Sequence, residues 1–536
     1  MEESVVCHDL SFAWPDGDVV LEHLTASFPA GLTGLVGLNG AGKSTLLRIL
    51  AGQLAPTSGT FRIAGAVGYL PQDLALGATA TIAQALGVAD ALAALVRVDV
   101  GRPELNDFDL LDDRWDIADR TAATLATFGF DADLDLDRRL DTLSGGEATL
   151  LAVAALLLKA PDVLLLDEPT NNLDTRARER LLSVLAGWTG PAIVVTHDRT
   201  LLDAVHHVAE LRPPTQRTSA ATVKLFGGNF TAYTQALAVE EEAARREVRA
   251  AESDLKRQQR ELREMHTKLD RRQRTGRKAF ESKRQPKIVM NALKRSAQVS
   301  AAKLAESQQG DVARANATLV EAQDRLREDD IIRIDLSQTE LPRGRDVVIT
   351  SDLVLRNGVR VELHLRGPER VGLTGRNGSG KTTLINTLAG SVPPRSGSAR
   401  VLVPMRLLPQ RMQLLDDAHR VLQAVRAVAP AADDHALRAQ LAQFMLRGDD
   451  VHRPVGTLSG GERFRATLAA LLLATPAPQL LIIDEPTNNL DLDSVSQLVT
   501  ALTAYRGALL VASHDQPFLD EIGLDRTVDL DSAAGG

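Results

Sequence analysis

Continuous apolar runs, each followed by polar residues, mark the predicted strands of this chain. The runs 163–166 (VLLL) and 192–195 (AIVV) have no polar position, which predicts strands that are buried on both faces of a parallel sheet. The first run ends at Asp167 and Glu168, and His197 follows the second. Because open α/β sheets bind ligands beyond the carboxyl ends of their strands, these polar residues are candidates for one site.

A long repeat decides the domain organisation. It runs from Leu143 to Asp174 and again from Leu458 to Asp491, and both copies contain LSGGE and DEPTNNLD. Each copy joins a Ser-Gly-Gly turn, an apolar helix, an apolar strand and an Asp-Glu pair. A repeat on this scale has to be recognised before any local motif is interpreted. The chain is therefore expected to hold two copies of one α/β nucleotide-handling domain.

The middle of the chain has a helical period instead. Apolar positions recur at alternating steps of four and three from Ala244 to Leu269, and again from Ala301 to Leu326, which predicts a coiled coil. We expect an antiparallel helical hairpin, each helix about 45 Å long over roughly 30 residues, with Gly276 and Pro286 interrupting the helix near the turn. The predicted domains are 1–232 (helical subdomain at about 75–160), a linker at 233–335, and 336–536.

Bulk composition is that of a soluble protein. The chain is 44% hydrophobic and 24% charged, and its single cysteine, Cys7, excludes an intramolecular disulfide. The opening MEESVVCHDL lacks the basic-then-apolar order of a signal peptide. The longest apolar runs, such as 150–158, are about half the roughly 18 residues that a membrane span needs. We expect a cytoplasmic protein with no membrane contact.

Charge is segregated along the sequence. The whole chain carries a net charge of −9, but residues 243–300 hold 18 Lys or Arg against 7 Asp or Glu. A solvated helix face is the ordinary explanation of such a run. Here acidic residues are nearly absent from the expected turn, which favours binding to a phosphate backbone. The expected contact residues are Arg274, Arg277, Lys278, Lys283, Arg284, Lys287, Lys294 and Arg295.

Each half contains a P-loop between an apolar stretch and a helix-like run. The first is GLNGAGKS at 37–44, and the second is GRNGSGKT at 375–382. Glycines let backbone N–H groups turn toward phosphates, the lysine reaches the β and γ phosphates, and the hydroxyl is offered to Mg²⁺. The expected ATP contacts are Gly37, Asn39, Gly40, Gly42, Lys43, Ser44, Thr45, Gly375, Asn377, Gly378, Gly380, Lys381, Thr382 and Thr383.

The remaining candidates supply metal ligands and a catalytic base. Asp167 and its counterpart Asp484 are suited to hold Mg²⁺, and Glu168 and Glu485 to accept a proton from the attacking water. His197 and His514 each follow their aspartate by 30 residues and are expected near the γ-phosphate. The predicted metal ligands are Ser44, Gln72, Asp167, Thr382, Gln410 and Asp484.

The order P-loop, Gln, LSGGE, Asp-Glu and His, present twice, resembles the ATP-binding cassette family. In that family LSGGE binds the γ-phosphate of the ATP held by the opposite cassette. The resemblance implies this role for Ser144, Gly145, Gly146, Ser459, Gly460 and Gly461. Trp14 lies where the family commonly has an aromatic side chain that stacks on adenine, but it fits the core equally well. The region 353–359 has no matching aromatic residue.

Two cassettes in one chain, DEPTNNLD in both, and a charged helical linker together resemble the ABC-F family. The resemblance implies an ATPase whose cassettes pair within one monomer and which binds the ribosome. Its linker would reach rRNA and P-site tRNA. One site would combine Lys43 with Ser459–Gly461, and the other Lys381 with Ser144–Gly146. Housekeeping translation and antibiotic protection both remain open.

Two points stay open at this stage. The first half has 23 more residues between its glutamine and LSGGE than the second, around 101–120, and these form either a reduced arm or a longer loop. The rival function is an ATP-binding subunit that docks on a separate membrane transporter, and a DNA-associated ATPase is a third. A basic hairpin between the cassettes would have no evident purpose in a transporter subunit.

Overall fold

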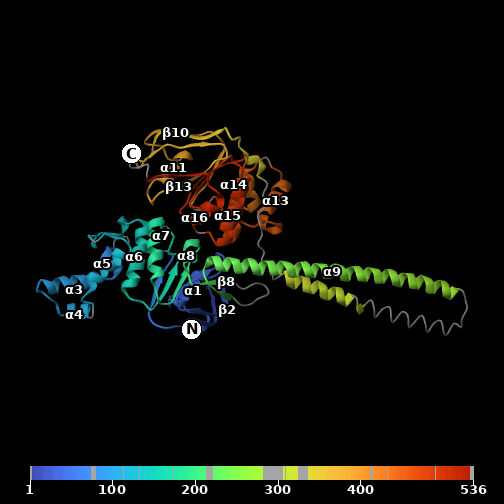
Figure 1. The fold of residues 1–536 in the computed structure, drawn as a ribbon, viewed down its shortest axis with the longest axis horizontal. Helices are drawn as coiled ribbons and strands as arrows, with labels where there is room; N and C mark the ends of the chain where they lie inside the picture. The colour runs from blue at the N-terminus through green and yellow to red at the C-terminus, as the bar shows by residue number, and fades with distance from the viewer. Residues whose placement is uncertain are drawn as a thin grey trace. The chain divides into compact units, whose positions relative to one another are not determined.

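The computed structural model describes residues 3–73, 80–112, 114–131, 133–171, 173–212, 221–281, 306–307, 309–323, 336–410, 414–430, 432–488 and 490–531. The chain divides into two compact units. One contains both cassettes, Met1–Phe230 with Ile331–Gly536, and the other is the linker, Thr231–Asp330. Figure 1 shows the ribbon, in which each cassette combines strands with flanking helices.

The first cassette is built on a six-stranded sheet of order β5-β6-β7-β3-β8-β9, parallel except for the β8–β9 pair. Its strands β3, β6 and β7 are buried at every residue, as the apolar runs predict. The strands are β3 (Leu32–Val36), β5 (Val67–Leu70), β6 (Val163–Asp167), β7 (Ala192–Val195), β8 (His207–Arg212) and β9 (Thr222–Gly227).

A second, antiparallel sheet of order β2-β1-β4 completes this cassette. Its strands are β1 (Glu3–Ala13), β2 (Val19–Pro29) and β4 (Ser58–Ile63). Asp9 has a φ of 51°, and a Cβ on Gly59 would lie 2.2 Å from the Asp9 carbonyl oxygen, so a glycine is required there. Buried side chains of both sheets and of α1 form one core.

The helices of the first cassette carry its site motifs. Helix α1 starts at the P-loop lysine, and α6 starts directly after Ser144. The α-helices are α1 (Lys43–Leu50), α2 (Ile82–Leu86), α3 (Ala89–Asp99), α4 (Leu105–Leu111), α5 (Ile117–Thr127), α6 (Gly145–Leu158), α7 (Thr175–Ala186) and α8 (Arg199–Asp203), with a 3₁₀ turn η1 (Leu140–Thr142).

The second cassette repeats this plan. Its parallel sheet has the order β15-β16-β17-β13-β18, and β10 pairs with β11, β12 and β14 in an antiparallel sheet. The close pairing of Asp9 with Gly59 also has a counterpart here. Asp352 has a φ of 46°, and a Cβ on Gly397 would lie 2.1 Å from the Asp352 carbonyl oxygen. The strands are β10 (Asp346–Val354), β11 (Arg360–Val361), β12 (His364–Arg366), β13 (Arg370–Thr374), β14 (Ser396–Val401), β15 (Met405–Leu408), β16 (Leu480–Asp484), β17 (Ala508–Ala512) and β18 (Arg526–Asp529).

Helices of the second cassette pack on both faces of its sheet around two buried clusters. They are α11 (Lys381–Leu388), α12 (Val421–Val428), α13 (Asp434–Gln443), α14 (Gly460–Leu472), α15 (Leu492–Ala504) and α16 (Gln516–Ile522), with 3₁₀ turns η2 (Ser337–Thr339), η3 (Gly448–His452) and η4 (Val455–Thr457). The prediction of an α/β fold with two P-loop cassettes and a long helical linker is confirmed.

The linker unit contains α9 (Phe230–Glu281) and a second helical stretch at 309–323. Figure 1 draws the second stretch beside α9. The alanines Ala251, Ala315 and Ala322 are buried, as a close helix pair requires. Helix α9 has 52 residues, which corresponds to about 78 Å at 1.5 Å per residue. The predicted length of 45 Å was therefore too short.

The expected break at Gly276 was wrong, because α9 continues through it to Glu281. A single glycine inside a helix costs only about 1 kcal/mol relative to alanine, and the neighbouring turns outweigh that cost. Pro286 lies outside the described residues. In the part of the chain that the structure describes, none of the helices has both the length and the apolar character of a membrane span.

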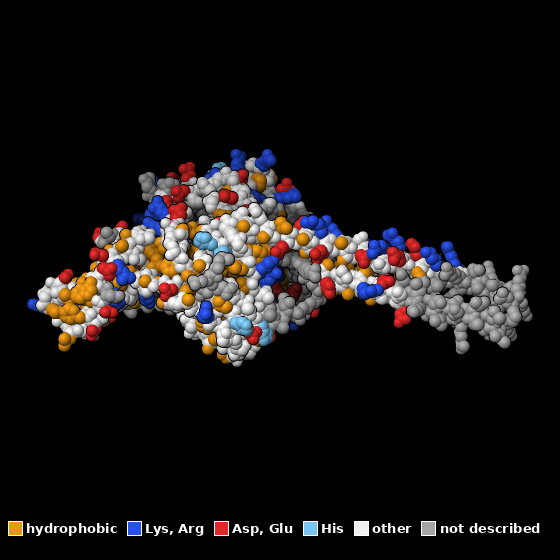
Figure 2. Space-filling model, turned by 60° about the horizontal axis from the view of Figure 1, so that its bottom comes forward, with side chains coloured by type: hydrophobic (Ala, Val, Ile, Leu, Met, Phe, Trp, Pro, Cys, Tyr) orange, Lys and Arg blue, Asp and Glu red, His pale blue; other side chains and the backbone are white. Residues whose placement is uncertain are grey.

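The additional residues of the first cassette form helices instead of an irregular loop. Helix α4 packs beside α3, and Arg97 on α3 donates two hydrogen bonds from Nε to the fully buried carboxylate of Asp107 on α4, at 3.1 and 3.0 Å. Hydrophobic side chains such as Leu105 and Phe108 are nevertheless exposed. Figure 2 shows hydrophobic atoms gathered over this end of the cassette.

Candidate nucleotide-binding sites

Each P-loop is closed around its own lysine. Lys43 Nζ donates to the carbonyl oxygens of Gly37 at 2.7 Å and Leu38 at 3.0 Å. Lys381 Nζ makes the equivalent bonds to Gly375 at 2.7 Å and Arg376 at 3.3 Å. Both lysines are buried. The ammonium group is thus held at the loop, where it can pair with phosphate oxygens.

The residue before each lysine has to be glycine. Gly42 and Gly380 have φ values of 95° and 106°, in the left-handed region. A Cβ on Gly42 would lie 2.8 Å from Val20 Cγ1, and one on Gly380 would lie 2.6 Å from Asn357 Nδ2. In both loops the backbone therefore approaches neighbouring side chains too closely for a residue with a Cβ.

Asp167 and Asp484 end the buried strands β6 and β16 beside the P-loop hydroxyls. Ser44 Oγ donates to Asp167 Oδ1 at 3.1 Å. Burial raises the pKa of the Asp484 carboxyl group, and the Thr382 hydroxyl lies close enough to oppose this increase. The second carboxylate oxygens, Asp167 Oδ2 and Asp484 Oδ1, are buried and have no hydrogen-bond partner among the described residues. A buried oxygen without a donor is costly unless a cation occupies its vicinity.

These groups fit Mg²⁺. The ion prefers oxygen ligands and is usually held by one or two protein groups together with substrate phosphates. A hydroxyl and a carboxylate at each site meet that requirement.

The glutamates that follow these aspartates have an unusual backbone. Glu168 and Glu485 have φ values of 50° and 45°, which side-chain-bearing residues rarely adopt, and such strain concentrates at functional sites. Burial raises the pKa of both carboxyl groups, and the nearby Lys43 and Lys381 ammonium groups oppose this increase. A buried carboxylate with a raised pKa is a competent proton acceptor for water.

The histidines lie against these glutamates. His197 Nε2 is 3.4 Å from Glu168 Oε1, and His514 Nε2 is 3.5 Å from Glu485 Oε1. Burial lowers the pKa of His197 to about 3 and that of His514 to about 4, so both rings are neutral near pH 7. His514 Nε2 is also 2.9 Å from Lys381 Nζ, where a neutral ring accepts the hydrogen bond.

The two LSGGE segments form matched helix starts. Ser144 Oγ accepts from the Glu147 backbone N–H at 3.2 Å, and Glu147 Oε2 accepts from the Ser144 N–H at 2.8 Å. Ser459 and Glu462 repeat this capping box at 3.3 and 2.8 Å. The serine hydroxyl keeps its own proton for donation, and a helix start favours an anion.

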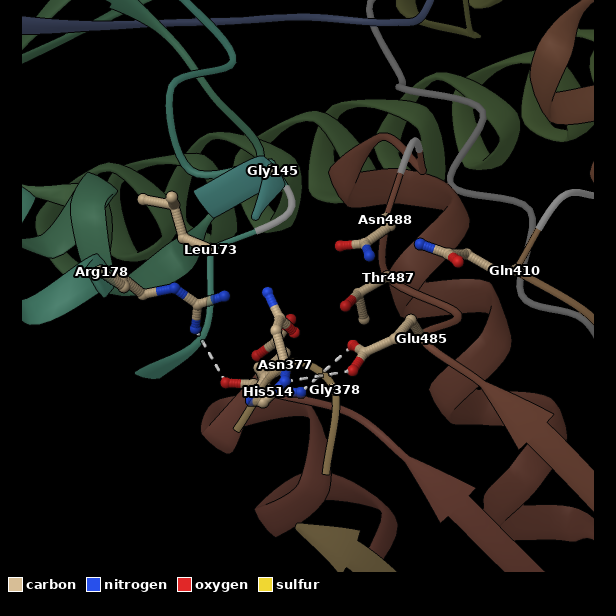
Figure 3. A pocket seen from close by; sticks show the side chains of 11 residues that line it. Gly145, Leu173, Arg178, Asn377, Gly378, Gln410, Glu485, Thr487, Asn488 and His514 are labelled. Atoms are coloured by element: carbon tan, nitrogen blue, oxygen red, sulfur yellow. Dashed lines mark hydrogen bonds and ion pairs between the residues drawn. The ribbon is translucent and has the colours of Figure 1, made fainter. Parts of the chain in front are cut away.

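The cassettes contact each other head to tail. A cavity of about 350 Å³ is lined by Gly145 of the first cassette and by Asn377, Gly378, Glu485 and His514 of the second. Figure 3 shows Glu485 and His514 pointing into this space. The volume falls in the range of small-molecule pockets. LSGGE of one cassette thus faces the P-loop of the other.

The opposite pair is arranged in the same way. A Cβ on Gly460 would lie 3.5 Å from Asn39 Cβ, so the second LSGGE faces the first P-loop. The Asn39 backbone N–H donates to Asp491 Oδ2 at 3.0 Å, across the interface between the cassettes. Asp491 Oδ1 also accepts from the Ser494 N–H at 2.9 Å, at the start of α15.

Comparison with known proteins identifies the same two cassettes over most of the chain. The family model described as ABC transporter matches residues 21–171 and 359–488. Tylosin resistance ATP-binding protein TlrC of Streptomyces fradiae is 31% identical, covering 95% of this chain and 94% of that protein. Energy-dependent translational throttle protein EttA of Mycobacterium tuberculosis (strain H37Rv) is 32% identical, covering 94% and 87%. The chain belongs to the ABC-F family.

A solved structure supports the fold. The chain described as RNase-L Inhibitor matches with a TM-score of 0.56 at 19% identity, covering 98% of this chain and 88% of that one. The predicted family is confirmed, and so is the prediction of an ATP hydrolase, because ABC-F cassettes bind and hydrolyse ATP.

Some predicted residues of this ABC-F protein lie apart from the clustered groups. Gln72 is exposed and forms no hydrogen bond with Asp167 among the described residues, whereas Gln410 lines the cavity. Trp14 is half-buried and packs edge-on against Phe12, with ring centroids 5.0 Å apart. That contact leaves both of its predicted roles open.

The predicted RNA-contact residues are only partly described. Arg274, Arg277 and Lys278 lie on α9. Outside the described residues lie Lys283, Arg284, Lys287, Lys294 and Arg295.

Three features of the sites were missed by sequence reasoning. Asp491, the last residue of the repeated DEPTNNLD, contacts the opposite P-loop, and its place in both repeats was the available signal. Arg48, on α1, lies near both Tyr69 and Asp167. Arg178 crosses to the second cassette, and no motif marked it.

Proposed function

We propose that this protein binds ATP at two composite sites, closes its cassettes on both nucleotides, and uses opening after hydrolysis to act on the ribosome. The observation that carries the proposal is the cavity in which Gly145 of the first cassette faces Asn377 and Gly378 of the second. An ATP held there would contact both bodies, so its binding would favour the closed state by its differential affinity.

Each site would catalyse hydrolysis by positioning the ATP phosphates and the attacking water and by stabilising the negative charge of the transition state. Lys43 and Lys381 would bind the β and γ phosphates, and Ser144 and Ser459 would donate to the γ-phosphate of the opposite cassette's nucleotide. Mg²⁺, held by the Ser44–Asp167 pair and by its counterpart in the second site, would neutralise phosphate charge. Its use here rests on the unpartnered oxygens of the aspartates.

The catalytic roles follow from protonation states. Glu168 and Glu485 would accept the proton of the attacking water, because burial raises the pKa of each carboxyl group above its ordinary value and makes it a stronger base. His197 and His514 stay neutral, so they would face the γ-phosphate without adding a buried charge. Loss of the γ-phosphate would remove the bridge between the cassettes.

The ribosome is the partner that the relatives favour. One relative is named as a translational throttle and another as a tylosin resistance protein. Figure 2 shows Lys and Arg side chains interspersed with Asp and Glu along the described part of the linker, so the proposed phosphate-backbone contact rests on the basic excess toward the predicted turn. A protein with this role would work in the cytoplasm as a monomer, with rRNA and P-site tRNA contacted by the basic segment 274–295.

A ribosome co-sedimentation assay tests the proposal. The double variant Glu168→Gln, Glu485→Gln keeps the shape of both side chains but removes the proton acceptors. It should still bind ATP, but its turnover should fall at least a hundredfold, which corresponds to about 2.7 kcal/mol of activation barrier. It should sediment with ribosomes only when ATP is present. Sedimentation of the same variant with duplex DNA or with membrane vesicles would support the two rival functions instead.

A second variant separates the linker from the cassettes. Replacing Arg274, Arg277 and Lys278 by Gln removes three positive charges at positions where α9 is already helical. Ribosome binding should weaken and depend less on salt, while ATP turnover without ribosomes stays unchanged. Replacing Arg245, Arg246 and Arg249, which pair with acidic residues of the same helix, is the matched control. Equal binding by both triple variants would contradict the proposed RNA contact.

A further inference from the structure

Arg178 reaches from the first cassette into the second ATP site. It lies on α7, four residues after Asp174, and its Nη1 donates to the His514 carbonyl oxygen at 2.8 Å. The same side chain lines the cavity that holds Glu485 and His514. Figure 3 shows the guanidinium directed across the interface toward His514. Its charge lies close enough to affect both of these groups.

The guanidinium is fixed from its own side. Arg178 Nε lies 2.8 Å from Asp198 Oδ2, and the two side chains are only 15% and 9% exposed. Asp198 is itself held at the start of α8, where its Oδ1 accepts from the Thr200 and Leu201 N–H groups at 2.9 and 3.3 Å. An arginine anchored in this way presents its remaining donors with little loss of conformational entropy.

The first ATP site has no equivalent of this residue. Four positions after Asp491, the second repeat has Val495, which is buried in the core of its own cassette. Arg199, the residue after Asp198, also reaches the other cassette. It pairs with Glu521 of the second cassette at 2.6 Å, whereas its counterpart Gln516 donates to Asp520 within its own cassette. Both arginines come from the first cassette.

We propose that Arg178 is a positioning residue that acts in trans on the second ATP site and makes the two sites kinetically unequal. By bonding the His514 carbonyl, it fixes the backbone from which the imidazole faces Lys381 Nζ and the Glu485 carboxylate. This inference rests on the composite sites proposed above. When the cassettes open, Arg178 would retain its ion pair with Asp198 and lose its hydrogen bond to the His514 carbonyl oxygen. The second site is therefore complete only in the closed state.

The test replaces Arg178 by the residue of the other repeat. Arg178→Val should lower turnover at the second site about tenfold, equivalent to about 1.4 kcal/mol, with KM changed less than twofold, because the side chain orients His514 without binding ATP itself. Arg178→Lys keeps one donor and should recover part of kcat. Arg176→Ala, an exposed arginine on the same helix, is the matched control and should equal the wild type.

Testing Arg178→Val in two variant backgrounds, each with one site inactivated, shows which ATP site depends on Arg178. With Glu168→Gln present, Arg178→Val should still lower the remaining turnover about tenfold, and with Glu485→Gln present it should change the remaining turnover less than twofold. Melting temperatures of all variants are measured in parallel.

Three outcomes overturn the proposal: an unchanged kcat in Arg178→Val, an equal effect in both backgrounds, or a loss in kcat that tracks the melting temperature and is not recovered by lysine. Failure of the composite sites is distinguishable, because the double Glu→Gln variant would then keep its turnover whatever residue stands at 178.

Discussion

Lys43 and Lys381 make the same 2.7 Å hydrogen bond, each to the carbonyl oxygen of the glycine that opens its P-loop. Ser144 and Ser459 cap their helices in the same way, and Glu168 and Glu485 share a left-handed backbone. Within the motifs, the two ATP sites are therefore built alike, since equal sequences form equal local hydrogen bonds.

Outside the motifs, the sites differ. In the second site His514 accepts from Lys381 and is held by Arg178, whereas His197 Nδ1 has no hydrogen-bond partner among the described residues. In the first site Arg48 lies near Asp167, at a position where the second repeat has Asn386. The difference teaches that motif identity does not make two sites equivalent, because residues outside the motifs set how each histidine and carboxylate is oriented.

Among the variants that test this difference between the two sites, the largest loss of ATP turnover is expected from replacing the P-loop lysines. Lys381→Ala removes a phosphate contact and also the hydrogen bond that orients His514, whereas Lys43→Ala is expected to remove the phosphate contact alone. Both should reduce ATP turnover, by roughly a hundredfold for Lys381→Ala and roughly tenfold for Lys43→Ala, if each charged hydrogen bond contributes about 1.4 kcal/mol.

Steady-state ATPase rates with a fluorescent-nucleotide binding titration provide the measurement. Lys159→Ala, which changes an exposed lysine at the end of α6, is the control. Equal losses in the two P-loop variants would remove the argued difference between the sites.

A smaller effect tests Trp14, which has no counterpart in the second cassette. If its ring stacks on adenine, Trp14→Ala should weaken ATP binding at the first site by about 1–2 kcal/mol, the usual contribution of one base–aromatic contact. If it only packs against Phe12, the melting temperature should fall while ATP affinity stays unchanged. Trp14→Phe is the control, because it keeps an aromatic face. Isothermal titration with a non-hydrolysable ATP analogue distinguishes the two cases.

The smallest effect concerns pH. Burial raises the pKa of Glu168 and Glu485, so the folded protein holds protons that the unfolded chain releases. The resulting stabilisation is fully present below the unfolded pKa, about 4.3, and is lost as pH rises through the raised folded pKa. The nucleotide-free protein should therefore melt at a lower temperature at about pH 8 than at about pH 6.

Each single Glu→Gln variant should flatten part of this dependence. The pH profile of the melting temperature, measured by differential scanning calorimetry, provides the check. A profile that is unchanged in the Glu168→Gln and Glu485→Gln double variant would show that other groups carry the pH dependence.

Much of the fold followed from local pattern. The apolar runs at 163–166 and 192–195 became the buried strands β6 and β7, and the period-3.5 stretch became α9. The family and the ATPase activity were also predicted correctly. The break predicted at Gly276 was wrong, because a single glycine is a weak helix breaker inside a long helix.

The sequence by itself determined the motifs and what each motif can do. A P-loop, a capping box and a buried strand that ends in Asp-Glu are formed by neighbouring residues, and their hydrogen bonds depend on short-range geometry. Only the tertiary structure decided which groups meet across the cassettes: Asp491 with the Asn39 N–H, Gly145 with the second P-loop, and Arg178 with His514. Arg178 and His514 are 336 positions apart. No local pattern encodes such a contact, because it depends on how two separately folded cores pack together.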